Sequence, residues 1–131
     1  MSDRDPAVVE ALEKGMALFN GREFFEAHEI WEETWSDTWE DERHLLQGLI
    51  QVAAGFYKLQ LGQPAGTAKL LEKALVHLRA VPKNYYAIDL ETLITAAETW
   101  GAAAKSMVEE WRTDYDESAL PRIEWLREHM Q

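Results

Sequence analysis

Cysteine is absent from the 131 residues of this chain. Its absence excludes disulfide bonds, thiolate metal ligands and thiol nucleophiles, and it fits a reducing compartment. Long apolar runs are absent too, since none approaches the roughly 18 residues that cross a bilayer. The N-terminal segment MSDRDPAVVE has no basic-then-apolar signal pattern. We therefore expect a cytoplasmic protein with no membrane partner.

Positive charge is scarce, because 13 lysines and arginines stand against 24 aspartates and glutamates and leave a net charge of -11. Such an acidic protein, without a basic stripe, repels a phosphate backbone, so we expect no nucleic-acid partner. Covalent catalysis is also disfavoured. The chain lacks both cysteine and a Gly-x-Ser-x-Gly motif, and so it shows no recognisable activated nucleophile.

Proline is scarce, and its four residues stand where helices would start or end, as Asn20-Gly21 and Gly62 also do. Between them, apolar residues recur at helical spacing, and no alternating strand pattern of useful length occurs. Pro6, with Asp5 as its cap, opens the first helix. Asp89 caps the last one, which passes Gly101 either as one bent helix or as two. The pattern predicts helices over residues 6–19, 24–35, 41–61, 65–80 and 89–111.

The segment FFEAHEIWEETW, residues 24–35, concentrates polar and aromatic side chains on one short helix. At about 100° per residue, the face around Phe24 is predicted to be buried and also holds Ala27, His28, Trp31 and Trp35. The opposite side holds Glu26, Glu29 and Glu33. Glu32 lies on the border, one turn from His28, so the two side chains can pair at the edge of the core.

Three interpretations of His28 stay open. It is a core histidine bonded to Glu32 or to a backbone carbonyl, and the acidic stripe is a solvated face. Alternatively, His28 and Glu32, with Glu29, line a small-molecule or metal pocket. In the third interpretation this face contacts a partner protein.

The helix predicted over residues 41–61 carries Gly48 and Gly55 on one side. Because an interior helix glycine costs about 1 kcal/mol relative to alanine, this pair indicates the close approach of another helix. Gln47, Gln51 and Lys58 flank the glycines. If the helix of residues 24–35 packs there, these side chains face its histidine and glutamates. Otherwise they are ordinary solvated residues.

The sequence has few histidines and carboxylates at the spacings that metal ligands have in helical proteins. Carboxylate-bridged metals in helical bundles use Glu-x-x-His motifs from two helices, and the chain has none. Asp41-x-x-His44 comes nearest, while His77 has no acidic residue one turn away. His28 and Glu32 supply two ligands, fewer than the three of a typical catalytic zinc site. We therefore expect no metal and no cofactor.

Three motifs together resemble the domain of unknown function 309 family. They are F-N-G-x-x-F-F-E-A-H-E-x-W-E-x-x-W from Phe19, Q-G-L-I-Q-x-A from Gln47, and G-x-A-x-L-L-x-K-A-L from Gly66. The resemblance covers about residues 11–90, including Y-x-I-D-L from Tyr86. It implies a compact all-α bundle in a bacterial or archaeal cytoplasmic protein, without an established activity. Many members carry a histidine where this chain has Lys58.

We therefore expect an all-α fold, a single-domain bundle of five or six helices built from helical hairpins. Residues 1–131 form one domain, with a family-like core at about 11–90 and a helical C-terminal extension at 91–131. A homodimer is expected, built partly from Trp111, Trp125 and Leu126. In the rival interpretation, the tail folds back on its own core.

The expected function is that of a binding or protein-interaction module with a polar pocket between the second and third helices. Its partner would be a protein or a small molecule. The alternative is a metal- or carboxylate-dependent hydrolase that uses His28 and Glu32, and whether the protein is an enzyme stays open. The pocket residues are predicted to be Glu26, His28, Glu29, Glu32, Trp35, Gln47, Gln51 and Lys58.

Overall fold

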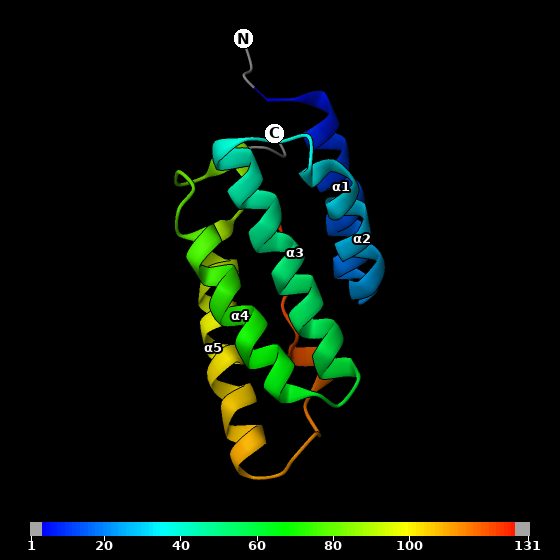
Figure 1. The fold of residues 1–131 in the computed structure, drawn as a ribbon, viewed down its shortest axis with the longest axis vertical. Helices are drawn as coiled ribbons and strands as arrows, with labels where there is room; N and C mark the ends of the chain where they lie inside the picture. Colours follow the sequence, from blue (N-terminus) through cyan, green and yellow to red (C-terminus); the bar gives the residue numbers. More distant parts are fainter. Residues whose placement is uncertain (1–3, 128–131) are drawn as a thin grey trace.

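Five α-helices make up most of the computed structural model, which describes residues 4–127 (Figure 1). They are α1 (Pro6–Asn20), α2 (Phe24–Trp35), α3 (Glu40–Gln60), α4 (Pro64–Leu78) and α5 (Leu90–Glu109). Two short 3-10 helices, η1 (Tyr85–Ala87) and η2 (Glu117–Ala119), lie in the connections. Within residues 4–127 no strand forms beyond an isolated bridge between Ile88 and Trp125. The predicted all-α bundle is confirmed, with five helices.

Local capping signals explain where the helices start. The Asp5 side chain accepts a hydrogen bond of 2.8 Å from the Ala7 backbone N–H. Asp89 accepts bonds from the Thr92 backbone N–H and hydroxyl at 3.2 and 2.8 Å. These carboxylates satisfy N–H groups that a first helical turn leaves free. Beyond the second cap, α5 continues through Gly101 as one helix.

Aromatic rings tie the first three helices to one core. Phe19 of α1, Phe24 of α2 and Phe56 of α3 are fully buried. The ring centroids of Phe19 and Phe24 are 4.9 Å apart, and those of Phe24 and Phe56 are 5.6 Å apart. Trp31 is also fully buried, and its indole N–H donates to the Ala11 carbonyl at 3.0 Å. The α1–α2 hairpin is thus fixed against α3.

The glycine pair of α3 faces α4. A Cβ atom on Gly48 would lie 2.6 Å from Leu78 Cδ2, and one on Gly55 would lie 3.3 Å from Leu71 Cδ2. The sequence suggests that α2 could pack on Gly48 and Gly55, and this prediction is therefore wrong. The α2 contacts are made instead by Phe24 and Phe25, whose rings meet Phe56 and Tyr57 of α3.

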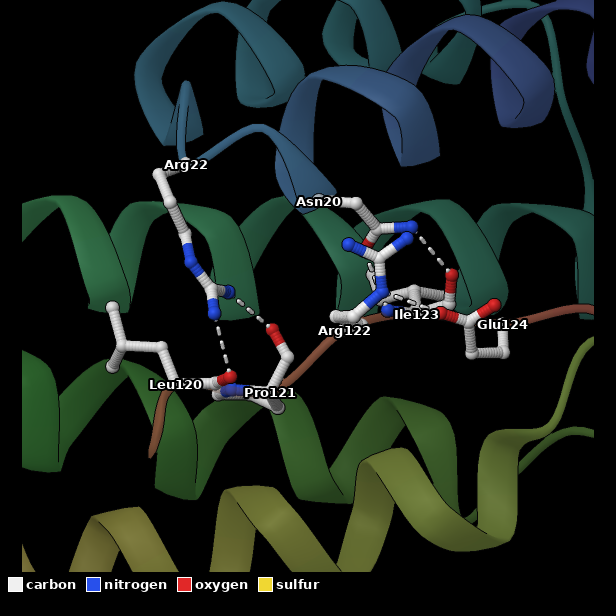
Figure 2. Close-up of polar contacts among 7 residues, drawn as sticks. All are labelled: Asn20, Arg22, Leu120, Pro121, Arg122, Ile123 and Glu124. Atoms are coloured by element: carbon white, nitrogen blue, oxygen red, sulfur yellow. Dashed lines mark hydrogen bonds and ion pairs between the residues drawn. The ribbon is translucent and has the colours of Figure 1, made fainter. Parts of the chain in front are cut away.

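Beyond α5, residues 120–126 form a strap, and Figure 2 shows its hydrogen bonds with Asn20 and Arg22. Arg22, in the α1–α2 turn, donates to the carbonyls of Leu120 and Pro121 at 2.9 and 2.8 Å. Asn20 exchanges two hydrogen bonds with the Ile123 backbone, of 2.8 and 2.9 Å. The strap therefore lies beside the α1–α2 turn, and it is held there by hydrogen bonds from Asn20 and Arg22 rather than by a helix.

The strap also limits the helical part of the predicted extension. Between Glu109 and residue 127 the described chain holds one short helix, η2, since Pro121 cannot donate within a helix and its neighbours bond to the α1–α2 turn. Trp125 and Leu126 are half-buried against their own chain, and the Leu126 N–H donates to the Ala87 carbonyl at 2.7 Å. None of the described helices is long and apolar enough to span a membrane.

Candidate functional site on α2 and α3

His28 and Glu32 are paired on α2, as their spacing predicts. His28 Nε2 lies 3.2 Å from Glu32 Oε1, and the side chains are 23% and 54% exposed. Because Nε2 faces a carboxylate, it carries the proton, and in a neutral ring Nδ1 is left as an acceptor. That Nδ1 atom is buried and has no hydrogen-bond partner within the described residues.

Aromatic side chains border His28 on the α3 side. The Phe25 ring centroid is 5.6 Å from that of His28 and 5.2 Å from that of Tyr57. Near the other end of α2, the Arg43 guanidinium lies 3.9 Å above the Trp35 ring. These two contacts show that α2 and α3 run antiparallel.

Two further buried polar atoms lie on the same pair of helices. Gln51 Oε1 and Trp35 Nε1 are both buried without a hydrogen-bond partner in the part of the chain that is described. Gln47 stands one turn from Gln51 on α3. His28 and Trp35 belong to α2, and Gln47 and Gln51 belong to α3, which packs against it. We call these four residues the α2–α3 seam.

One end of the seam opens into a pocket of about 260 Å³. Trp35 and Gln47 line it from the seam. Its other lining residues are Glu40, Arg43, His44 and His77. Arg43 also donates a long bond of 3.4 Å to the Thr38 carbonyl, and this contact holds its guanidinium over the indole.

The remaining predicted site residues lie elsewhere. Glu26 and Glu29 are exposed and line an open hollow with Glu32 and Ile30 of α2 and with Leu18 of α1. Lys58 sits in the last turn of α3, where its stem packs near Gly66 of α4. The eight predicted residues therefore do not form one pocket, because α2 presents its carboxylates away from the helix face that meets α3.

Sequence reasoning did not pair His44 with His77. Their Nδ1 atoms are 2.9 Å apart, across α3 and α4. Burial, and secondarily His44, lowers the pKa of His77 below its ordinary value. Both residues stand at similar distances from the turn that joins α3 to α4, which is the signal that could have paired them. Among the described residues, no group of three or more acidic or histidine side chains could hold a metal ion.

The fold and the seam define a helical-bundle protein with unpaired polar groups between two antiparallel helices. The family model described as domain of unknown function (DUF309) matches residues 12–70. The predicted resemblance is thus confirmed over a segment that contains the whole seam.

The chain is also 30% identical over 82 residues to an uncharacterized protein of Aquifex aeolicus (strain VF5). This match covers 62% of the chain and 25% of that relative. The chain thus spans about a quarter of the relative's length. Neither description states an activity.

Proposed function

We propose that this protein is a binding module that holds a small polar ligand in the α2–α3 seam. The observation that carries the proposal is the set of three buried atoms without a hydrogen-bond partner among residues 4–127, His28 Nδ1, Trp35 Nε1 and Gln51 Oε1. Leaving such an atom unsatisfied costs about 1–3 kcal/mol. Three such atoms on two facing helices are therefore best explained by a partner from outside the described chain.

The chemistry of these atoms restricts the ligand. Gln51 Oε1 accepts, and His28 Nδ1 accepts while the ring is neutral, so that end of the seam calls for a donor. Trp35 Nε1 donates and calls for an acceptor. Seven residues of helix separate His28 from Trp35, which is about 10 Å. The ligand should therefore be a compound that carries a hydroxyl, amide or amine group as the donor. A compound long enough to span the two ends would also place an acceptor at Trp35 Nε1.

Nuclear magnetic resonance tests this proposal, with fragments of four classes as probes: a polyol, a primary amide, an alkylamine and a carboxylate. In tag-free protein, at least one donor class should shift the Gln51 amide and His28 ring signals saturably. Trp31 is the built-in control, because its indole N–H is already bonded to the Ala11 carbonyl. Saturable shifts that vanish in Gln51→Leu support the binding of a ligand in the seam. If no class gives them, the seam is filled by ordered water and the proposal fails.

The alternative function is hydrolysis, in which Glu32 orients His28 as a general base for water. The 3.2 Å contact between the two side chains favours it, because a carboxylate that fixes the imidazole tautomer is common to such pairs. Release of nitrophenol from nitrophenyl esters measures this activity. A rate that falls at least about a hundredfold in His28→Ala supports it, and an unchanged rate rejects it.

We further propose that the protein forms a homodimer through the end of α5. Trp111 is 95% exposed and Val108 is 43% exposed, and exposed aromatic surface is typical of interfaces. Trp125 and Leu126 make contacts within their own chain and contribute less than the sequence suggested. Sedimentation equilibrium should give a mass of about twice 15.1 kDa, and Trp111→Ala should reduce it to one chain. A single-chain mass for the unaltered protein rejects the dimer.

A further inference from the structure

His44 and His77 meet outside the α2–α3 seam, on helices α3 and α4. Their Nδ1 atoms are 2.9 Å apart and their ring centroids are 5.2 Å apart. His44 is exposed and His77 is half-buried. Both rings border the 260 Å³ pocket. The contact brings two imidazole nitrogens from different helices within chelating distance of each other, on a surface that solvent reaches.

We propose that His44 and His77 chelate a divalent transition-metal ion, and that the ion links α3 to α4. Neutral imidazole is a common ligand for copper, nickel and zinc. Two metal–nitrogen bonds of about 2.0–2.1 Å that meet at a right angle separate the nitrogens by about 2.9 Å. The observed Nδ1 separation has this value, which favours the tetragonal geometry of Cu²⁺ and Ni²⁺.

The apo contact is a hydrogen bond, in which one Nδ1 donates and the other accepts. On binding, the donating ring exchanges its Nδ1 proton for one on Nε2 through solvent, so both rings stay neutral and no net proton is released. Each ring turns until its Nδ1 lone pair meets the ion. Both side chains have room to turn because neither is fully buried. The imidazoles replace two water ligands of the ion, so the exchange balances without oxidation or reduction.

The surroundings support a cation over an anion. Glu40 lines the same pocket, and the protein carries a net charge of -11. Arg43 is the cationic side chain of the pocket lining, but its guanidinium is held over Trp35 at 3.9 Å. With two protein ligands, water completes the coordination, so the ion exchanges more readily than in a three-ligand site. Copper binds most tightly, as the order of affinities for nitrogen ligands requires.

Copper sulfate titrated into tag-free, EDTA-dialysed full-length protein tests the proposal. Calorimetry should show one ion per chain, and the copper electron paramagnetic resonance spectrum should show splitting from two imidazole nitrogens. His44→Gln and His77→Gln should each weaken binding about tenfold or more and lose one nitrogen. His129→Gln is the matched control and should bind as the unaltered protein does. Copper should raise the Tm of the unaltered protein but not of the two variants.

Equal affinity in the unaltered protein and in both variants would overturn the proposal, as would a loss of binding confined to His129→Gln. His44 and His77 both lie at solvent-accessible positions. Circular dichroism in the helical range verifies that the His44→Gln and His77→Gln variants fold. Should His77→Gln unfold, His44→Gln alone decides, through the count of nitrogens. The metal site does not rest on the function proposed for the seam. Copper binding is measured by calorimetry and electron paramagnetic resonance, whereas the seam is tested by the nuclear magnetic resonance signals of His28 and Gln51.

Discussion

Trp31 and Trp35 stand one turn apart on α2 and differ in one hydrogen bond. The Trp31 indole N–H donates to the Ala11 carbonyl at 3.0 Å, whereas Trp35 Nε1 is buried without a partner in residues 4–127. Both carry an apolar body with one polar atom, and such indoles usually find a partner when buried. The first tryptophan therefore holds the α1–α2 hairpin together, and the second makes no such bond within residues 4–127.

Gly15 of α1 makes the Trp31 position possible. A Cβ atom at residue 15 would overlap the Trp31 indole, beginning with Nε1. Gly15→Ala must therefore displace the ring and break its bond to Ala11, and we expect the free energy of unfolding to fall by about 3 kcal/mol or more. Urea unfolding measures the change.

Gly101→Ala is the matched control, because a Cβ there meets Leu71 Cβ at an ordinary 3.9 Å. That variant should gain up to about 1 kcal/mol, the usual preference of a helix for alanine. Equal effects at residues 15 and 101 would show that Trp31 does not occupy the space beside Gly15.

Among the elements, α3 has a different neighbour on each side. It meets α4 through Gly48 and Gly55, and the large side chains of α2 pack elsewhere on its surface. Gly48→Ala should destabilise by about 1 kcal/mol, because overpacking against Leu78 costs more than the helix gains. Gly55→Ala should be less costly, since its nearest contact is 3.3 Å rather than 2.6 Å. Thermal unfolding of both variants measures the difference.

A second substitution isolates the contact. Leu78→Ala removes the side chain that a residue-48 methyl would meet, so the cost of Gly48→Ala should disappear in the Leu78→Ala background. Additive effects of the two substitutions would mean that Leu78 is not the obstacle.

The helices could be predicted closely because their signals are local. Phe24–Trp35 coincides with the expected segment, and both predicted aspartate caps are in place. The His28–Glu32 pair likewise follows from helical spacing alone. Packing could not be predicted in the same way, since α3 carries apolar or small residues on more than one side. The His44–His77 contact depends on the register between α3 and α4, which helical periodicity does not fix and which only the distance of each residue from the connecting turn indicates.

Over the whole molecule, the strap of residues 120–126 ties the segment beyond α5 to the α1–α2 turn. Arg22→Ala removes the bonds to Leu120 and Pro121, and we expect a loss of about 1–3 kcal/mol. Arg122→Ala is the control within the strap, because Arg122 is exposed and pairs with Glu124 two residues away. Such a surface pair contributes little. Hydrogen exchange should accelerate at the Ile123 N–H in Arg22→Ala alone, and equal rates in both variants would contradict this role of Arg22.

Two tyrosines in η1 connect stability to alkaline pH. Burial, helped by the carboxylates of Glu42, Asp41 and Glu40, raises the pKa of Tyr85 to about 12. Burial and a hydrogen bond to Glu42 raise the pKa of Tyr86 as well. Above the ordinary pKa of 10, the unfolded chain loses these protons and the folded chain keeps them. The free energy of unfolding should therefore fall as pH rises from about 10 towards 12.

Urea unfolding of Tyr85→Phe against the unaltered protein measures this contribution. The variant should lose less stability over the same alkaline range, because phenylalanine has no proton to release. Parallel pH profiles for the two proteins would show that Tyr85 does not contribute.

A crystal structure with the strongest fragment tests the proposed binding of a polar ligand in the α2–α3 seam. We expect the fragment to donate to His28 Nδ1 and Gln51 Oε1, at heavy-atom distances of about 2.7–3.2 Å. A Gln51 amide whose NH₂ donates to His28 Nδ1, with the fragment elsewhere or absent, would rule out this binding, because the two side chains would then satisfy each other.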